Sequence, residues 1–335
     1  MTRYLGMLLL LLLGACSSTG PVTFNETSET PHLVWPATPE ISRIKFITAF
    51  KNAEDLGFEK NLFRRLLDLL TGSEEHSLSH PYTIAVNENR IAVADPDAAI
   101  VHLFELDSKS YRRIDHAGNH RLESPIGVSL AKNRLFIADS KLNKVFILNS
   151  SLKTLHMLKG FLRPTSLAFD PKLQRLYIAD TLAHEVLVFD SDGNLIYKIG
   201  ERGEQDLQFN FPSHLAFFDQ RLFVNDTMNF RIQSFDNNGL HLKTFGKQGN
   251  ASGYFTQSKG LALDSDGHIY IADALANRIQ IFDQSGAFLL EFGGVGDAPG
   301  NFRMPSGLAI WDDKIFVADS YNQRIQVFQY LKVGN

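Results

Sequence analysis

Short runs of apolar, β-branched and aromatic residues recur along most of the chain, separated by turns rich in Gly, Asp and Asn. Such runs are typical of strands rather than helices. Six of them begin with a basic or imidazole side chain and end in an aspartate: Asp95, Asp139, Asp180, Asp226, Asp273 and Asp319. These aspartates are 44, 41, 46, 47 and 46 residues apart. A period of about 45 residues with up to four strands per copy predicts a β-propeller with one blade per copy.

A second landmark precedes each aspartate and marks the start of the blade. It is a proline in five copies and a serine in the fifth: Pro81, Pro125, Pro164, Pro212, Ser258 and Pro305. Within the copies, turns such as Asp190-Ser-Asp-Gly193 predict hairpins, because glycine takes a positive φ at little cost. The shared landmarks predict six blades of unequal length.

The last copy lacks a fourth strand, and the N-terminus offers one. The copy ends at Tyr330, after its third strand, whereas Arg43–Phe50 resembles the fourth strands of other copies. We therefore expect this N-terminal strand to complete blade six, which removes the open edge of an incomplete ring. Residues 41–335 are then one unit.

Residues 58–71 interrupt the strand pattern just before the first blade. Their leucines and Phe63 fall at helical spacing with charges opposite, and Gly72 follows as a stop. The spacing predicts a short helix over 58–71 that packs on its own propeller. A docking helix for another envelope protein is the alternative.

The N-terminus predicts export. Arg3 is followed by an apolar run over 5–13 that is too short to span a bilayer. Leu13-Gly14-Ala15-Cys16 resembles the lipobox of bacterial lipoproteins, whose cysteine is acylated. We expect a signal peptide over 1–15 and a lipidated Cys16 with a flexible tether over 16–40. Ser17 favours the outer over the inner membrane of the bacterial envelope.

The repeat itself can be compared with a known one. Pro-Ser-Gly-Leu-Ala-Ile310, followed by Lys-Ile-Phe-Val-Ala-Asp319-Ser-Tyr-Asn-Gln-Arg-Ile-Gln-Val-Phe328, resembles the NHL repeat. The resemblance implies an all-β fold, a six-bladed β-propeller of NHL type. The preface Trp35–Glu40 resembles that of bacterial six-bladed NHL lipoproteins, whose genes often neighbour those of multihaem c-type cytochromes. This implies envelope proteins as partners, multihaem cytochromes in extracellular electron transfer among them.

Composition and charge exclude several classes of protein. A single cysteine cannot form an internal disulfide, a Cys-based zinc site or an iron–sulfur cluster. The net charge of −4 lacks the basic excess on which sequence-independent binding of nucleic acid depends. We expect a monomeric propeller that binds no nucleic acid.

Two enzymatic comparisons guide the search for a site. Peptide-amidating lyases resemble this repeat and place a histidine after the blade proline in three blades, where this chain has Tyr82, Ile126, Thr165, Ser213, Lys259 and Ser306. That triad is absent. Calcium-dependent lactonase propellers need converging acidic side chains. Each repeat aspartate ends a strand, where a carboxylate accepts backbone N–H bonds, so we expect a structural role for all six. No cofactor and no metal site are predicted, and bound calcium stays open.

Arginines recur five residues after three of the aspartates: Arg231, Arg278 and Arg324, with Lys144 in the second copy. They could form a basic rim that binds anions. Glu185 occupies the same position in the third copy and breaks such a ring. We expect the arginines to form ion pairs and hydrogen bonds between neighbouring blades.

One face of the propeller remains as the predicted binding surface. The loops before the first strand and after the second strand of each blade share one rim, and they carry His80, Tyr82, Asp97, Lys141, Arg163, His184, His214, Met228, Phe230, Lys259 and Tyr321. This mixture suits a protein or peptide contact. The favoured function is a non-catalytic, lipid-anchored scaffold. The alternatives are a metal-dependent lyase or lactonase-like hydrolase and a ligand-sensing propeller.

Overall fold

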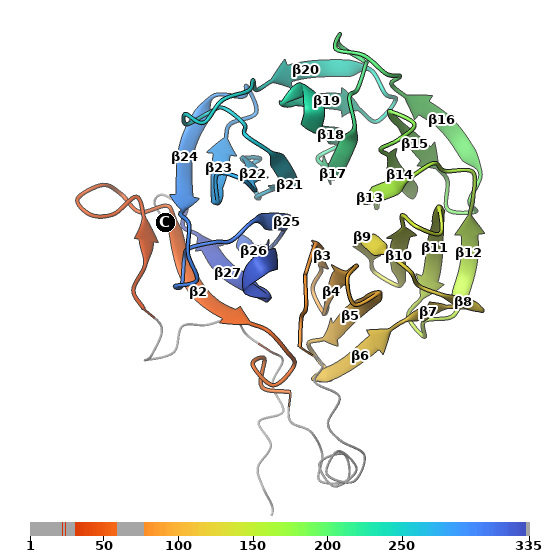
Figure 1. Ribbon diagram of the computed structural model, residues 1–335, viewed down its shortest axis with the longest axis horizontal. Coiled ribbons are helices and arrows are strands. Elements are labelled where there is room, and N and C mark those ends of the chain that lie inside the picture. The colour runs from red at the N-terminus through yellow and green to blue at the C-terminus, as the bar shows by residue number, and fades with distance from the viewer. Residues whose placement is uncertain (1–21, 23, 25–30, 59–76, 333–335) are drawn as a thin grey trace, which may run out of the picture.

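The computed structural model describes residues 22, 24, 31–58 and 77–332, and their strands form six antiparallel blades around a central axis (Figure 1). One edge strand of each blade lies at the centre of the ring, and the other edge strand faces outwards (Figure 1). The protein is an all-β, six-bladed propeller, as the repeats predict.

The first three blades follow one another along the chain. Blade one contains β3 (Thr83–Val86), β4 (Arg90–Asp95), β5 (Ile100–Glu105) and β6 (Ser110–Ile114). A small hairpin then follows, made of β7 (His116–Ala117) and β8 (His120–Arg121). Blade two contains β9 (Pro125–Ala131), β10 (Arg134–Asp139), β11 (Lys144–Asn149) and β12 (Thr154–Leu158). Blade three contains β13 (Pro164–Asp170), β14 (Arg175–Asp180), β15 (Glu185–Phe189) and β16 (Leu195–Ile199).

The other three blades complete the ring. Blade four contains β17 (Pro212–Phe218), β18 (Arg221–Asp226), β19 (Arg231–Asp236) and β20 (His241–Phe245). Blade five contains β21 (Ser258–Leu263), β22 (Ile269–Asp273), β23 (Arg278–Phe282) and β24 (Phe288–Gly293). Blade six contains β25 (Pro305–Trp311), β26 (Lys314–Asp319), β27 (Arg324–Tyr330) and β2 (Ile44–Phe50), with β1 (Val34–Trp35) added outside. Two 3₁₀ turns are η1 (Thr227–Asn229) and η2 (Ser320–Asn322).

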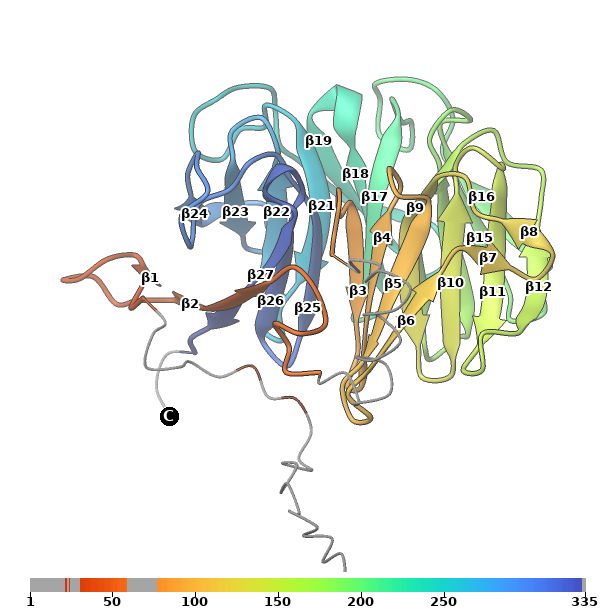
Figure 2. The ribbon, with the colours of Figure 1, turned by 60° about the horizontal axis from the view of Figure 1, so that its bottom comes forward.

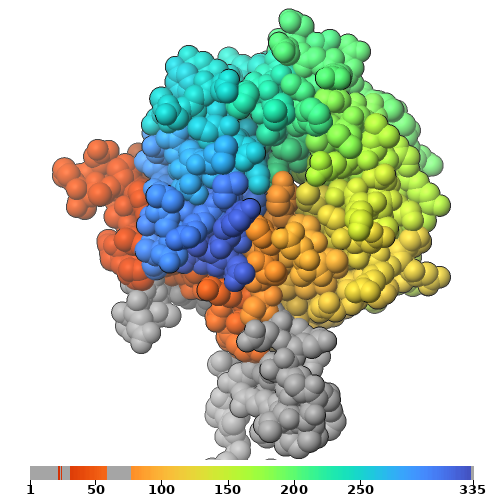
Figure 3. All heavy atoms as spheres, in the orientation of Figure 1, coloured from red at the N-terminus to blue at the C-terminus, as the bar shows by residue number. Residues whose placement is uncertain are grey.

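The ring is closed by the N-terminal strand, as the incomplete last copy predicts. β2 pairs antiparallel with β27, with Lys45 opposite Gln329 and Phe50 opposite Ile325. In the space-filling view the N-terminal segment lies against the last two blades (red against blue, Figure 3). A second clasp joins blade six to blade one, because the hydroxyl of Ser320 donates to the carbonyl of Pro81 at 2.6 Å. Strand pairing and side-chain bonds therefore both close the circle.

The hydrophobic core lies between the blades rather than at the centre of the disk. The described residues contain six apolar clusters, each contributed mainly by a pair of neighbouring blades. The second strand of blade one, Arg90–Asp95, is buried along its whole length because its two faces are covered by adjacent blades. The outer strand of blade three, Leu195–Ile199, is mostly exposed or half-buried. The loops therefore form the two faces of the disk, and the first strands line its central channel.

Long loops before blades four, five and six are anchored by buried phenylalanines. Phe209, Phe255 and Phe302 are fully buried, and each forms a β-bridge with the preceding loop. Gly246 shows why the loop needs glycine: its φ is +103°, and a Cβ there would meet the ring of Phe255 at 2.4 Å. These anchors fix the loops that lead onto the rim of the disk.

Part of the predicted tether belongs to the folded domain. Val34–Trp35 pairs with β2, and the indole of Trp35 packs against Phe292 and Phe328 with ring centroids 5.7 and 5.9 Å apart. The expectation of a flexible tether up to residue 40 is therefore wrong for this stretch, because its aromatic side chain is used to cover blades five and six. Phe24 also packs on the core, 5.2 Å from the ring of Phe316.

Two other predictions fall largely outside the described residues. These are the signal peptide with Cys16 and the helix over 58–71, of which Phe58 alone is described. Phe58 is buried and contacts Phe104 at 6.3 Å between ring centroids. Among the described residues, no helix has the length and apolar character needed to cross a membrane.

Candidate functional site

The repeat aspartates hold the connecting loops onto the blades. Each carboxylate is buried at the end of a second strand and accepts backbone N–H bonds from the loop that enters the blade. The donors are Ser79 and His80 for Asp95, Glu123 and Ser124 for Asp139, Leu162 and Arg163 for Asp180, Asn210 for Asp226, Thr256 and Gln257 for Asp273, and Arg303 for Asp319. This is the geometry of a scaffold element repeated around the ring.

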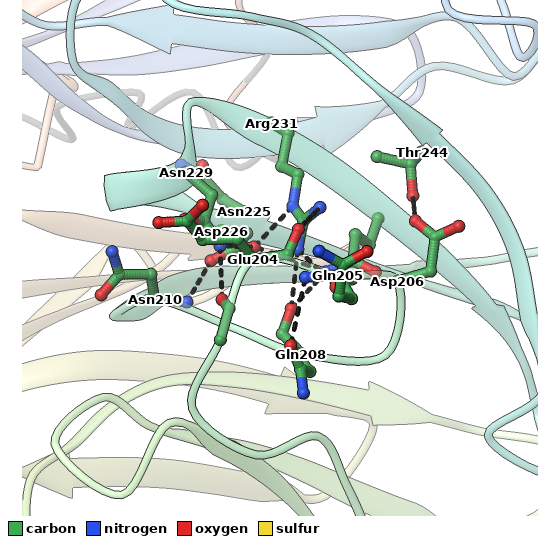
Figure 4. Close-up of polar contacts among 12 residues, drawn as sticks. Glu204, Gln205, Asp206, Gln208, Asn210, Asn225, Asp226, Asn229, Arg231 and Thr244 are labelled. Atoms are coloured by element: carbon green, nitrogen blue, oxygen red, sulfur yellow. Dashed lines mark hydrogen bonds and ion pairs between the residues drawn. The ribbon is translucent and has the colours of Figure 1, made fainter.

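In blade four, the aspartate is the centre of a larger polar network (Figure 4). Arg231 lies 2.8 Å from the carboxylate of Asp226, and Asn229 donates to the same carboxylate at 2.8 Å. The guanidinium of Arg231 also donates to the carbonyls of the loop that enters the blade, those of Glu204, Gln205 and Gln208. The guanidinium donors of Arg231 are therefore satisfied by the aspartate and by the loop that enters the blade.

The other recurring positions repeat or modify this network. Arg324 pairs with Asp319 at 2.8 Å, and Arg278 pairs with Glu291 at 2.9 Å. Glu185, in the third copy, pairs with Lys198 at 2.9 Å instead. Asp180 then lacks an arginine, and burial together with the nearby charge of Glu185 raises its pKa. The arginines bind the loops between blades and do not form a free basic ring.

The structure places the predicted rim residues in several different surroundings, with Arg163 exposed in the loop that enters blade three. Near the junction of blades six and one, His80 contacts the ring of Tyr321 at 4.5 Å and the carboxylate of Asp97 at 3.2 Å. Lys141 is exposed and pairs with Glu123 at 3.0 Å. These residues lie on the rim but remain apart from the centre.

Two predicted rim residues do not face the surface as expected. His184 is only 8% exposed, and its Nδ1 accepts the backbone N–H of Phe211 at 3.2 Å. Phe230 is half-buried and packs on the core between blades four and five. Both stand four residues after the repeat aspartate with a positive φ, 57° and 53°. This left-handed turn directs them back onto the blade, so including them in the binding rim was wrong.

Three other predicted residues meet in the central channel and form what we call the channel group: Tyr82, His214 and Lys259. His214 and Lys259 lie in the first strands of blades four and five, and Tyr82 immediately precedes the first strand of blade one. β3 and β17 lie on opposite sides of the centre (Figure 1). The rings of Tyr82 and His214 are 5.9 Å apart, and Nζ of Lys259 lies 5.0 Å from the centre of the Tyr82 ring. Tyr82 therefore reaches across the channel mouth.

The channel group is poorly compensated electrostatically. Burial and, to a lesser extent, the charge of Lys259 lower the pKa of His214 to about 3. Burial also lowers the pKa of Lys259. Nδ1 of His214 lies 3.0 Å from the hydroxyl of Ser213, whereas Nε2 is buried with no hydrogen-bond partner among the described residues. The group thus places a cation beside a neutral histidine, with no carboxylate among its own members.

We expect His214 to make the protein less stable as the pH falls below about 6.5. In the unfolded chain, imidazole binds a proton near that pH, whereas in the fold its pKa is about 3. Between these values the unfolded state binds more protons, so the free energy of unfolding falls by up to about 1.4 kcal/mol per pH unit from this group. Urea titrations at two pH values should therefore show a smaller loss in His214→Phe than in the wild type. The exposed His32→Gln should behave as the wild type, and identical losses in all three proteins would contradict the assignment.

An arc of exposed apolar side chains curves around the channel mouth. The residue two positions after the repeat aspartate is large and apolar in blades three to six, and these four residues form what we call the apolar arc: Leu182, Met228, Leu275 and Tyr321. Their exposed fractions are 45–61%. In blades one and two the same position carries Asp97 and Lys141. Leu182 and Leu275 are missing from the predicted rim, although their offset from the aspartate equals that of Met228.

Among the described residues, neither a cluster of metal ligands nor the pocket beside blade five coincides with this site. Within the part of the chain that the structure describes, no three or more His, Cys, Asp or Glu side chains group as metal ligands. A pocket of about 620 Å³ lies instead between the segment Pro36–Ile44 and blade five, where His268 is hydrogen-bonded to Asp264 at 2.8 Å. Its side chains His268, Tyr270 and Tyr330 are already hydrogen-bonded to acidic groups, so we take the channel mouth as the better candidate.

Comparisons with known protein families support the architecture. A family model described as a 6-bladed beta-propeller matches residues 204–292, and the model of the NHL repeat matches residues 302–328. Comparison with the curated proteins found no match.

Solved structures with the same fold have diverse titles. An auxiliary nutrient binding protein from Bacteroides thetaiotaomicron has 15% identity and a TM-score of 0.60, over 76% of this chain and 70% of that one. A streptogramin B lyase has 11% identity and a TM-score of 0.57, over 76% and 94% of the two chains. Virginiamycin B lyase from Staphylococcus aureus has 14% identity and a TM-score of 0.54, over 76% and 96%. At these identities the likeness shows the fold alone.

Proposed function

We propose that this six-bladed propeller with an NHL repeat is a non-catalytic scaffold that binds other proteins of the bacterial cell envelope through its rim face. We define the rim face as the side that carries the loops entering each blade and the loops after each second strand. The observation that carries the proposal is the apolar arc on this face, four exposed apolar side chains on four successive blades. Single exposed apolar residues are ordinary, but exposed apolar side chains repeated at one position of four successive blades indicate an interaction surface.

The channel group favours binding over catalysis. A histidine with a pKa of about 3 is a weak general base at neutral pH, and no carboxylate within the described part of the chain is hydrogen-bonded to His214. Lys259 contacts the ring of Tyr82 rather than a nucleophile or an acid. The lyases of similar fold therefore provide no reason to assign a reaction to this channel.

The N-terminal segment supports a lipid anchor on the opposite face. Val22 and Phe24 lie against loops that join the first and second strands of blades one and six, near Asn87 and Asp312. These loops are at the other end of the blades from the rim. Cys16 lies six positions before Val22, a reach of about 20 Å at most. A lipid on Cys16 would then hold the disk near the membrane with the rim face directed away from it.

Site-specific crosslinking in the cells that express the protein tests the proposal. We expect a photo-crosslinking residue at Met228 to capture a defined envelope protein, with multihaem c-type cytochromes as the first candidates. The same residue at Leu173, which is 46% exposed on the opposite face, is the matched control. The captured protein, identified by mass spectrometry, should bind the purified propeller and lose binding to Met228→Glu.

Two results would contradict parts of the proposal. Equal adducts at Met228 and Leu173, or binding that survives Met228→Glu together with Leu275→Glu, would remove the rim face as the docking surface. Cys16→Ser should release the protein from the membrane fraction, and unchanged membrane association would remove the lipid anchor.

A further inference from the structure

The channel mouth holds positive charge without a negative partner. Nζ of Lys259 lies over the ring of Tyr82, and no carboxylate among the described residues pairs with it. Burial lowers the pKa of this lysine, and no acidic group offsets the effect. A partly desolvated ammonium that lacks an anion costs free energy, which a bound anion would recover.

Two further donor groups, those of Arg163 and Tyr82, belong to the same region of the channel. The charge of Arg163 reaches Tyr82, where it lowers the pKa that burial raises. The backbone of Arg163 is fixed by Asp180 at 2.6 Å, and its side chain is exposed beside the channel. The hydroxyl of Tyr82 has no hydrogen-bond partner among the residues that the structure describes. The ammonium of Lys259, the guanidinium of Arg163 and the phenol of Tyr82 are thus available to bind an anion.

We propose that the channel mouth binds a carboxylate of the docked partner, through Nζ of Lys259 and the hydroxyl of Tyr82, with Arg163 at the entrance. The proposal rests on the proposed function, because the apolar arc around the channel determines what flanks the carboxylate. The partner is therefore an acidic side chain or chain terminus between apolar residues, which lie against Met228 and its neighbours in the arc.

The chemistry favours a carboxylate over a more highly charged anion. Phosphate groups are usually held by several arginines, helix N-termini or backbone N–H groups together. Here one lysine and one exposed arginine come with a single hydroxyl. A carboxylate, with a single negative charge and two acceptor oxygens, matches these three donor groups.

The first test needs no partner. Lys259→Met keeps the length of the side chain and removes its charge, so we expect the free protein to melt at a higher temperature than the wild type. Lys259→Arg is the control that keeps the charge. A lower melting temperature for Lys259→Met would show that the charge is already compensated within the fold, and would overturn the inference.

The second test adds probes to the full-length protein. The peptide acetyl-Leu-Glu-Leu-amide, at roughly ten times its dissociation constant, should raise the melting temperature of the wild type by about 2–4 °C. The matched peptide with Gln in place of Glu should raise it less, and Lys259→Met should abolish the difference between them. Lys259→Arg should keep it. An equal effect of both peptides on the wild type, or an equal stabilisation by inorganic phosphate, would overturn the carboxylate assignment.

The two proposals can fail separately. If Met228 captures a partner that binds Lys259→Met as tightly as the wild type, the scaffold function stands and the carboxylate site is refuted. If the Glu peptide acts through Lys259 while the rim captures no protein, the site binds a small carboxylate ligand and the scaffold function is refuted. A loss of partner affinity of about tenfold or more in Lys259→Met, with its fold intact, supports both.

Discussion

A chain that begins at Lys51 is expected to be unfolded or aggregated at 25 °C. It lacks β2, whose buried side chains are Ile44, Phe46, Ile47 and Phe50. Full burial of each is worth about 1.5–3 kcal/mol, so their loss removes about 6–12 kcal/mol. This is comparable to the whole stability of a typical domain, about 5–15 kcal/mol. The exposed edge of β27 would in addition offer a template for aggregation.

Two companion chains separate closure from simple loss of length. A chain that begins at Ile41 keeps β2 and loses Trp35 and Phe24, so it should fold with reduced stability. A chain that begins at Lys51 but carries residues 41–50 after Lys332, through a short Gly/Ser linker, should recover the cooperative transition. The geometry permits this, because the backbone N–H of Leu331 donates to the carbonyl of Arg43 at 2.7 Å. Urea unfolding followed by circular dichroism measures the stability of all three chains. Equal midpoints for the chain that begins at Lys51 and the chain that begins at Ile41 would contradict closure by β2.

The closure was predictable because it depends on a repeated pattern. The last copy stops after its third strand at Tyr330, and Arg43–Phe50 has the apolar spacing of a fourth strand, so the sequence alone pairs two segments almost 290 residues apart. The hairpin His116–Arg121 belongs to no repeat, and it was not predicted. The strand Val34–Trp35 was missed for a different reason. The residues around it are rich in proline, and strand propensity does not reveal its pairing with β2.

The channel group shows where such reasoning stops. The offsets from the repeat landmarks place Tyr82, His214 and Lys259 on the same face, and all three belong to the predicted rim. The offsets do not show how far each side chain reaches, so the contact of Tyr82 with His214 across the channel becomes evident only in three dimensions. The misplacement of His184 has a similar origin, since its left-handed backbone turns the side chain inwards.

The second large effect is expected from Asp226→Ala, which removes the centre of the network in blade four. The substitution leaves Arg231 without its carboxylate and the backbone N–H of Asn210 without an acceptor. Breaking a buried ion pair by removing one partner typically costs about 3–5 kcal/mol. Asp180→Ala is the control, because Asp180 is as buried as Asp226 and accepts two backbone N–H bonds where Asp226 accepts one, but it lacks an arginine.

Removing Asp180 should lower the free energy of unfolding less than removing Asp226, because the pKa of Asp180 is raised in the fold. Burial and the charge of Glu185 raise the pKa of Asp180 above that of the unfolded chain, so its charged form at neutral pH opposes folding, and this opposition is relieved as the pH falls towards the folded pKa. Urea titrations at pH 7 should therefore show a smaller loss for Asp180→Ala than for Asp226→Ala. The double variant Asp226→Ala with Arg231→Met should lose less than the two single losses combined, because the orphaned charge is gone. Equal losses at the two aspartates would mean that the backbone bonds alone stabilise the rim, and that the arginines recurring in blades four and six add nothing to it.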